Sequence, residues 1–288
     1  MKLKRYFLKK KRRVKRMRAL VTDIERGATF DGPGIRTVVY FKGCPLRCLW
    51  CSNPETQKLE NEFWDYDGSL YKGNKNPCSG CPAANSLKQV AKDMTLEEVF
   101  EIVMKDENFY RNSGGGVTLS GGEILVNSAF AIELFEKLKE EYINTAIETT
   151  GYGNYKDLEN LAKLTDTVLF DIKHLNSQKH KEYTSVSNEI ILENLTKLSK
   201  WHKKIIMRFP FIKGINDDEK NIRQTAEFLK KLNLLEVNIL PYHTMGLEKY
   251  RKLGREYPMK TLEKHTQAEL DNAVGIMNSY GLKAKLYG

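Results

Sequence analysis

Short apolar runs alternate with helix-like stretches along most of the chain. The first run, at 35–41, is β-branched and aromatic and predicts a strand. The same pattern predicts strands at 117–120, 145–149, 168–171, 205–209 and 237–240, with a closing strand at 282–287. Apolar residues at helical spacing predict helices at 96–104, 129–138, 156–164, 189–202, 218–232 and 264–280. Strands that are mostly followed by helices indicate βαβ units and a parallel sheet.

The order of these elements predicts an α/β fold. A partial barrel fits it better than a doubly wound sheet, although periodicity alone does not decide between the two. In parallel barrels the chemistry collects at the carboxyl ends of the strands. A polar stretch at about 58–95 breaks the alternation, and we interpret it as an insertion between the first and second units.

Positive charge is concentrated at the amino terminus. Eleven of the 47 Lys and Arg residues lie in the first 18 positions, which hold no acid, whereas the remainder carries 36 basic and 37 acidic residues. We therefore expect a disordered basic arm at 1–18 and a folded core at 19–288. The alternatives for the arm are an electrostatic handle for nucleic acid, an acidic partner or a membrane surface, or an upstream extension if Met17 is the true start.

The cysteine count limits the cellular setting. Five cysteines and no secretory signal argue against a disulfide framework and predict a reducing, cytoplasmic compartment. The sequence has no run of 18 apolar residues, so no membrane span is predicted. Clustered thiols in such a compartment usually bind metal or carry out redox chemistry.

Three of the cysteines follow the first predicted strand, in Cys44-Pro45-Leu46-Arg47-Cys48-Leu49-Trp50-Cys51. Thiolates at this spacing can converge on one iron–sulfur cubane, and three ligands leave one iron of a 4Fe–4S cluster open to a small chelating molecule. Zinc with a further ligand is the alternative, whereas core packing explains three cysteines in eight residues poorly. The pattern resembles the radical S-adenosylmethionine superfamily, in which the open iron binds the methionine amino and carboxylate groups.

Gly121, Gly122 and Glu123 follow the second predicted strand. Glycine permits a close backbone approach to a ligand, and a carboxylate there can meet a ligand ammonium. A lone Gly-Gly-Glu is usually a turn, but its position after the cysteine loop favours a ligand role. The superfamily usually has proline after this glutamate, and the Ile124 found here is expected to alter the loop without removing the carboxylate.

Charged residues recur where the later strands end. Glu148 belongs to the third strand, Asp171 and Lys173 to the fourth and Arg208 to the fifth, and His243 follows the sixth. Alternation puts Asp171 and Lys173 on one face, where they could bind a ribose, a carboxylate or a cation. Taken singly, the charged residues would form ordinary surface ion pairs and the histidine would be structural. Their repetition at consecutive strand ends favours a ligand pocket.

The resemblance becomes narrower when all motifs are taken together. They occur in order over about residues 19–255, as Asp31-Gly32-Pro33-Gly34, Cys51-Ser52-Asn53-Pro54-Glu55, the loop 120–123, Asp171-Ile172-Lys173 and Pro241-Tyr242-His243. This set resembles the glycyl radical enzyme activating enzymes, the family that includes pyruvate formate-lyase activating enzyme. The resemblance implies a partial (β/α)6 TIM-like barrel, the radical SAM core, with its cluster near the mouth.

The resemblance also implies roles for individual residues. Cys44, Cys48 and Cys51 would ligate the cluster and act in catalysis. The S-adenosylmethionine pocket would consist of Trp50, Gly121, Gly122, Glu123, Asp171, Lys173, Arg208 and His243. Glu148 and Asp171 match a monovalent-cation site, where the family often has Asp at the position of Glu148. Asp31, Gly32, Pro33 and Gly34 would lie toward the protein substrate.

The implied reaction begins with an electron from flavodoxin or ferredoxin. S-adenosylmethionine is cleaved to methionine and a 5′-deoxyadenosyl radical, which takes a hydrogen from a glycine Cα of a partner glycyl radical enzyme. The flanking amides weaken that bond, which explains why glycine is the target. We expect one 4Fe–4S cluster, anaerobic conditions, a monomer, and no membrane or nucleic-acid partner.

The second cysteine pair departs from many relatives. Those that activate choline lyase, glycerol dehydratase or arylacetate decarboxylases carry a ferredoxin-like insert with eight further cysteines, whereas only Cys78 and Cys81 remain here. Two thiols cannot ligate a cluster alone, so we predict a degenerate insertion with free thiols. A redox pair or a metal site shared between subunits is the alternative. Rival functions are a radical enzyme acting on RNA or a small molecule, and a non-catalytic metal-binding protein.

Overall fold

The computed structural model describes residues 17–65, 87–259 and 263–287. Within these ranges one sheet has the strand order β11-β10-β9-β8-β7-β6-β2-β1-β5, and a separate ladder pairs β3 with β4. The strands are β1 Arg18–Ala28, β2 Arg36–Phe41, β3 Phe63–Asp65, β4 Leu87–Gln89, β5 Lys92–Thr95, β6 Gly116–Gly121, β7 Asn144–Thr149, β8 Thr167–Asp171, β9 Ile205–Phe211, β10 Glu236–Pro241 and β11 Lys283–Leu286. The α-helices are α2 Leu96–Val103, α3 Glu107–Ser113, α4 Ser128–Glu140, α5 Tyr155–Ala162, α6 Ser177–Thr184, α7 Glu189–Leu198, α8 Glu219–Lys231, α9 Leu247–Lys252 and α10 Gln267–Ser279.

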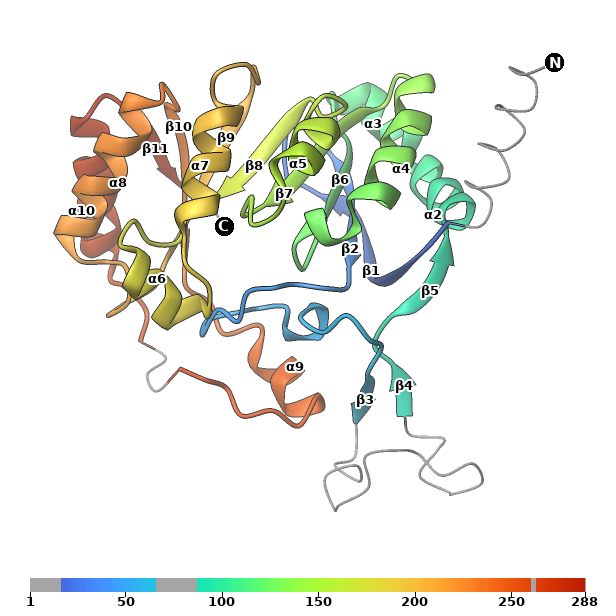
Figure 1. Cartoon of the computed structure of the whole chain (residues 1–288), viewed down its shortest axis with the longest axis horizontal. Coiled ribbons are helices and arrows are strands. Elements are labelled where there is room, and N and C mark those ends of the chain that lie inside the picture. The colour runs from blue at the N-terminus through green and yellow to red at the C-terminus, as the bar shows by residue number, and fades with distance from the viewer. Residues whose placement is uncertain (1–16, 66–86, 260–262, 288) are drawn as a thin grey trace.

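The strands from β2 through β6, β7, β8, β9 and β10 to β11 pair in parallel, each with the next. β1 is antiparallel to both β2 and β5. The order ends at β5 on one edge and β11 on the other, so the sheet is an open barrel. This arrangement confirms the α/β class and the parallel strands that alternation predicted (Figure 1).

Several helices begin at side chains that cap their free backbone N–H groups. Thr95 and Glu98 form a reciprocal capping box at the start of α2, and Thr266 and Glu269 form another at α10. The carboxylate of Asp218 accepts from Asn221 N–H at the start of α8. These local signals fix where the helices begin, and the apolar face of each helix then packs on the sheet.

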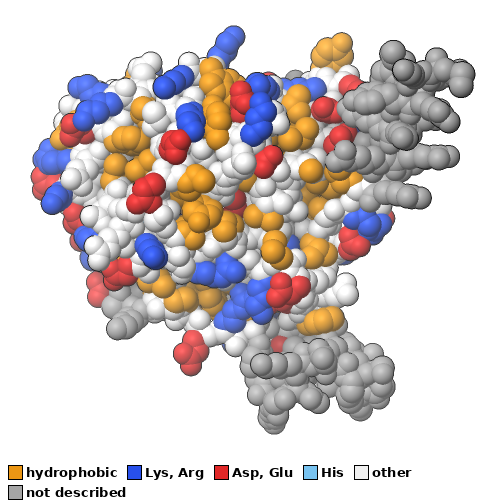
Figure 2. Space-filling model, in the orientation of Figure 1, with side chains coloured by type: hydrophobic (Ala, Val, Ile, Leu, Met, Phe, Trp, Pro, Cys, Tyr) orange, Lys and Arg blue, Asp and Glu red, His pale blue; other side chains and the backbone are white. Residues whose placement is uncertain are grey.

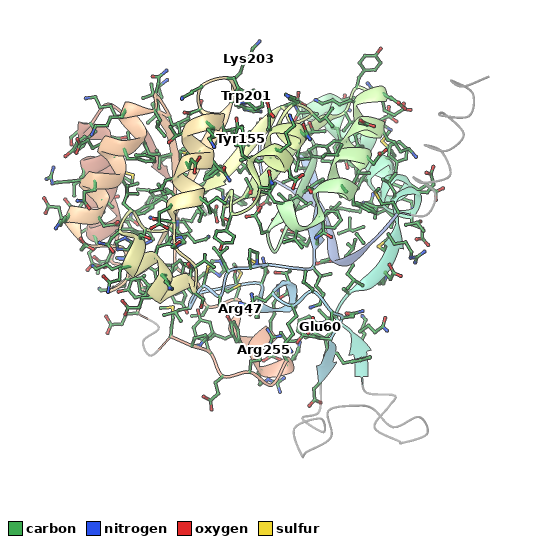
Figure 3. All side chains as sticks on the ribbon, in the orientation of Figure 1. Arg47, Glu60, Tyr155, Trp201, Lys203 and Arg255 are labelled. Carbon is green, nitrogen blue, oxygen red and sulfur yellow. The ribbon has the colours of Figure 1, made fainter. Side chains whose placement is uncertain are left out.

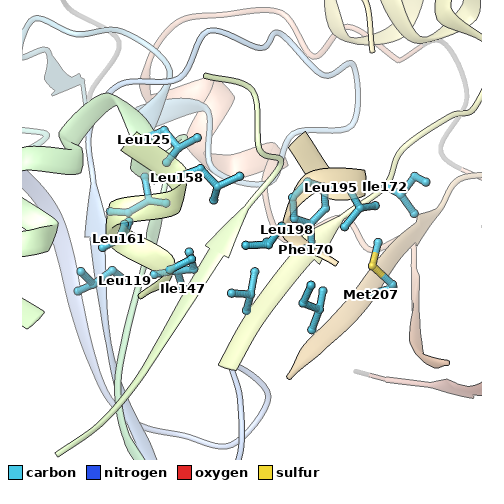
Figure 4. Packing of buried hydrophobic residues seen from close by; sticks show 14 of the residues in the cluster. Leu119, Leu125, Ile147, Leu158, Leu161, Phe170, Ile172, Leu195, Leu198 and Met207 are labelled. Atoms are coloured by element: carbon cyan, nitrogen blue, oxygen red, sulfur yellow. The ribbon is translucent and has the colours of Figure 1, made fainter. Parts of the chain in front are cut away.

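The core lies between the parallel strands and their helices. Figure 4 shows side chains from neighbouring strands and from α5 and α7 meeting in one layer. The strand residues Leu119, Ile147, Phe170 and Met207 are buried there. Since side chains alternate along a strand, the residue after each of these points to the other face, inside the barrel. Those four residues are Ser120, Glu148, Asp171 and Arg208.

Two predicted boundaries are wrong. Arg18 already belongs to β1, and the Met17 carbonyl accepts from Leu96 N–H at 3.2 Å, so the sheet begins inside the predicted arm 1–18. β5 pairs with β1, so the end of the predicted insertion 58–95 is part of the main sheet. Residues 1–16 of the arm and 66–86 of the insertion, with Cys78 and Cys81, lie outside the described residues.

The two ends of the barrel differ in what they carry. The cysteine loop after β2, together with α9, lies in the lower half of Figure 1. Figure 3 places Arg47 and Arg255 on this side, and Tyr155, Trp201 and Lys203 on the opposite side, where the Trp201 indole donates to the Tyr155 hydroxyl at 3.0 Å. Charges of both signs are mixed over the visible surface in Figure 2, as expected for a near-neutral body. No helix among the described residues is long and apolar enough to cross a bilayer.

Candidate active site

A cavity of about 230 Å³ opens at the carboxyl ends of the parallel strands. At about 30 Å³ per water molecule it has room for several waters, so it suits a small molecule better than a lone ion. Its lining includes nearly all the predicted pocket residues, namely Cys44, Cys48, Trp50, Cys51, Gly121, Gly122, Glu148, Asp171, Lys173, Arg208 and His243. The strand-end rule therefore predicted this cavity correctly.

The three cysteines of the loop after β2 carry free thiols and line one wall of the cavity. The loop is held by hydrogen bonds from Arg47 N–H to the Thr184 carbonyl at 2.7 Å and from Cys51 N–H to the Cys48 carbonyl at 3.1 Å. Burial raises the pKa of all three thiols, that of Cys48 to about 12. Without a metal the thiols are neutral, and a bound metal centre would have to stabilise the thiolates.

The glycine pair joins the end of β6 to the cysteine loop. A Cβ on Gly122 would lie 2.1 Å from the Gly43 carbonyl oxygen and 3.0 Å from Cys44 Cβ, and one on Gly121, whose φ is +116°, would lie 2.2 Å from Phe41. No side chain fits at either position. The close approach predicted for these glycines is thus made to the chain itself, and it places their backbone beside Cys44.

The Glu123 side chain contacts the end of β7. It is buried and is not part of the cavity lining. The carboxylate accepts from Thr149 Oγ1 at 2.5 Å, from Thr150 N–H at 2.8 Å and Oγ1 at 2.5 Å, and from Leu125 N–H at 3.2 Å. With these donors the carboxylate ties the β6 loop to the end of β7, and its predicted contact with a ligand ammonium stays a prediction. No pattern in the sequence indicates this contact.

Lys173 and Asp171 form an ion pair on the cavity wall, with Nζ 2.7 Å from Oδ2. Burial disfavours a charged Lys173, but Asp171 and the Cys48 sulfur raise its pKa above the ordinary value. The ammonium therefore stays charged beside the cysteine loop. Their position on one face, predicted from alternation, is confirmed.

Three carboxylates surround the Arg208 guanidinium. Nη1 forms an ion pair with Glu148 and lies 3.8 Å from Asp31, and Nε lies 3.8 Å from Asp171. Burial raises the pKa of Asp31, against the opposing effect of Arg208 and Arg36. Asp31 is not part of the cavity lining. The predicted contact of Asp31, Gly32, Pro33 and Gly34 with a protein substrate stays a prediction.

Trp50 and His243 complete the predicted set. Trp50 is buried against Tyr242 and Ile212, in a small apolar cluster that covers the cysteine loop. His243 lines the cavity and is largely exposed. Partial desolvation of its imidazole, together with the nearby Lys264 and Lys249, lowers its pKa, so the ring is neutral near pH 7.

The matches to known proteins fit this geometry. The family model of the radical SAM superfamily matches residues 38–229. A choline trimethylamine-lyase activating enzyme from Oleidesulfovibrio alaskensis is 36% identical over 91% of this chain and 96% of its own length. A (2S)-3-sulfopropanediol dehydratase activating enzyme from Klebsiella oxytoca is 37% identical over 92% and 98% of the two chains.

The chain belongs to the glycyl radical enzyme activating enzymes of the radical SAM superfamily. A trans-4-hydroxy-L-proline dehydratase activating enzyme from Clostridioides difficile is also similar, with 33% identity over 94% of this chain and 100% of that one. Among solved structures, a domain of pyruvate-formate lyase-activating enzyme from Bacteroides vulgatus has a TM-score of 0.52 and 30% identity, covering 60% of this chain and 99% of that chain.

Enzymes of this family use a 4Fe–4S cluster with three cysteine ligands, and S-adenosylmethionine. The described residues suit such a cluster. No group of three or more His, Cys, Asp or Glu in the described ranges is arranged to hold a single metal ion. In a cubane each thiolate binds a separate iron. The three thiols on the cavity wall would each bind one iron, and membership of this family favours the cluster over the zinc alternative.

Gln57 is a cavity residue that sequence reasoning missed. Its carbonyl accepts from Cys44 N–H at 3.1 Å, and its side-chain amide hydrogen-bonds to the Cys51 thiol. Arg255 Nη1 donates a hydrogen bond to the Gln57 side-chain oxygen at 3.4 Å. Gln57 thus contacts both ends of the cysteine loop of this activating enzyme. Its position after Cys51-Ser52-Asn53-Pro54-Glu55-Thr56 was the signal available.

Proposed function

We propose that this chain activates a glycyl radical enzyme of the lyase or dehydratase class. The support comes from its relatives, whose names refer to activation of a choline trimethylamine-lyase, a sulfopropanediol dehydratase and a hydroxyproline dehydratase. The reaction on the partner is removal of one hydrogen atom from a glycine Cα, which leaves the radical on the partner and a closed-shell 5′-deoxyadenosine behind.

In this proposal Cys44, Cys48 and Cys51 hold the cluster, and the backbone of Gly121 and Gly122 borders the methionine group. When bound, the cluster supplies the electron that splits S-adenosylmethionine into methionine and a 5′-deoxyadenosyl radical. One observation carries the assignment: three free thiols, the glycine pair and the Lys173–Asp171 pair line a single cavity.

The charged residues have distinct tasks. The Lys173 ammonium offsets the negative charge of the thiolate ligands, and Asp171 keeps that ammonium protonated and oriented. Neutral His243 on the rim can donate or accept a hydrogen bond with the cofactor. The apolar packing of Trp50 on Tyr242 and Ile212 gives the cysteine loop one water-excluding side, and a bound cofactor would displace water from the cavity on the other.

The partners follow from the same chemistry. The electron donor is a flavodoxin or ferredoxin, and the activating enzyme works as a monomer that binds a glycine loop of its partner. The segment Asp31-Gly32-Pro33-Gly34 would contact that loop beside the cavity wall, where Asp31 lies 3.8 Å from Arg208. The basic arm at 1–16 is not required for this reaction.

The test is anaerobic activation of a glycyl radical lyase or dehydratase encoded beside this chain. The expected result is an organic radical on the partner, seen by electron paramagnetic resonance, whose hyperfine doublet collapses when the partner contains Cα-deuterated glycine. If 5′-deoxyadenosine forms but no such partner acquires a radical, and a chain that lacks residues 1–16 loses affinity for RNA, the RNA-modifying alternative is correct instead.

A further inference from the structure

Arg208 brings together acids from three separate elements. Asp171 at the end of β8 is its direct register neighbour, Glu148 comes from β7, and Asp31 comes from the connection between β1 and β2. Glu148 forms an ion pair with the guanidinium, and Asp31 and Asp171 each place a carboxylate oxygen 3.8 Å from one of its nitrogens. The centre of this acidic cluster is therefore already filled by a positive charge.

In each of the two carboxylates expected to bind a monovalent cation, both oxygens already face donors of the protein. Glu148 accepts from Ser120 Oγ at 2.5 Å through one oxygen and pairs with Arg208 through the other. Asp171 accepts from Lys173 Nζ at 2.7 Å through Oδ2, and its Oδ1 faces Arg208 Nε. A metal cation between them would displace these donors and meet two fixed cations, which repel it.

The length of Glu148 makes this arrangement possible. β8 lies between β7 and β9, so Glu148 and Arg208 stand two strand spacings apart, or about 9–10 Å along the hydrogen-bonding direction. Glu148 is level with Leu169 and Ile206, two residues before Arg208, so a long side chain is needed on each strand for the two charges to meet. An aspartate at 148 would be one methylene shorter and would lose the ion pair with the guanidinium, which would keep only its longer contacts to Asp31 and Asp171.

We propose that the Arg208 guanidinium is a built-in cation, which takes the place of the monovalent cation between Glu148 and Asp171. Binding of S-adenosylmethionine by this chain is therefore independent of potassium and sodium. The pair Glu148–Arg208 is the determinant of that independence, with Arg208 as a positioning residue. The inference rests on the proposed function, because it concerns the pocket assigned to that cofactor.

The experiment measures equilibrium binding of S-adenosylmethionine to the full chain with its cluster reconstituted and not reduced. Binding is compared in potassium, sodium and tetramethylammonium chloride at equal ionic strength. The expected dissociation constant of the natural chain changes by less than about twofold among the three salts. A loss of about tenfold or more when tetramethylammonium replaces potassium would overturn the proposal.

Two variants test whether the guanidinium is the cause. Arg208→Gln removes the fixed charge and Glu148→Asp shortens its partner, and both are expected to bind the cofactor at least about fivefold better in potassium than in tetramethylammonium. Their melting temperatures should also rise with potassium, whereas that of the natural chain should not. Variants that fold but remain insensitive to potassium would refute the proposal.

A further outcome separates this inference from the function beneath it. If the natural chain binds no S-adenosylmethionine in any salt while its iron content and fold are normal, the proposed function fails, and the inference fails with it. If binding is present only with potassium, the function stands and the built-in cation is refuted.

Discussion

Arg36 and Arg208 are two arginines in different parts of the barrel, and both their burial and their partners differ: Arg36 is fully buried, whereas the Arg208 side chain is partly exposed to the cavity. Arg36 begins β2, and it donates to neutral acceptors on Thr118 at 2.6 Å, Val117 at 2.9 Å, and Pro33 and Asn144 at 3.0 Å. Arg208 faces three carboxylates on the cavity wall, and its buried Nε has no hydrogen-bond partner among the described residues.

The contrast separates a structural arginine from a functional one. Burial lowers the pKa of Arg36 to about 10. Its N–H groups are all directed at neighbouring acceptors, so Arg36 ties together the amino ends of adjacent strands. Arg208 is level with the end of β8, and its charge is balanced by Glu148 and Asp171 of the cavity wall and by the nearby Asp31. The amino end of the barrel thus supports the fold, and the carboxyl end supports the chemistry.

The largest expected effect comes from removing a cluster ligand at the carboxyl end. Cys48→Ala leaves two thiolates, which cannot hold the cubane, so cleavage of S-adenosylmethionine should fall to background. The cleavage is measured by chromatography of the 5′-deoxyadenosine formed after reduction. Cys78→Ala is the control and should keep most of the cleavage. Full cleavage in the first variant would refute the cysteine assignment, and loss in the second would revive a second metal site.

The next effect concerns the fold. Arg36→Met leaves the acceptors around it unpaired in the core, and should lower the free energy of unfolding by about 3 kcal/mol or more. Arg208→Met opens onto the cavity, where water can solvate the acids, and should cost only about 1 kcal/mol. Urea denaturation of both variants measures the difference. Equal losses would contradict the division between the two ends.

A pH effect should also come from the carboxyl end. His174, just beyond Lys173, is buried, and burial lowers its pKa to about 4. The unfolded chain then binds more protons between about pH 6.5 and 4, so stability is full above this window and falls within it, by up to about 3 kcal/mol. Urea midpoints across the window measure the slope, and His174→Gln should flatten it. An unchanged slope would assign the loss to other groups.

The smallest expected effect concerns Gln57. Its hydrogen bond to Cys51 withdraws charge from that ligand, so Gln57→Leu should make the cluster harder to reduce and move its midpoint potential to a more negative value. A redox titration followed by electron paramagnetic resonance measures the potential. Gln57→Glu, which keeps the size but not the donor, should shift it in the same direction. An unchanged potential in both would make Gln57 a structural residue only.

Sequence reasoning predicted the parallel strands and most of the cavity. Both depend on local patterns: apolar alternation marks the strands, and the carboxyl ends of parallel strands must meet at one edge. It missed β1, whose polar residues at Thr22, Asp23, Glu25 and Arg26 hide the alternation. It also missed α9, which is too short to show a helical period.

The contacts across the barrel could not be predicted in the same way. Glu123 looks like a ligand in the sequence, and only the packing of the β7 end shows that Thr149 and Thr150 occupy its carboxylate. The Glu148–Arg208 pair spans an intervening strand, and no local spacing indicates it. Side chains with several available partners are resolved only by the tertiary structure.

The most direct test of the central claim is reductive cleavage of S-adenosylmethionine by the anaerobically reconstituted chain. The account predicts about four irons per chain, held by Cys44, Cys48 and Cys51, and 5′-deoxyadenosine after reduction with dithionite. A chain that folds and binds one metal ion, takes up no iron–sulfur cluster and forms no 5′-deoxyadenosine would contradict it.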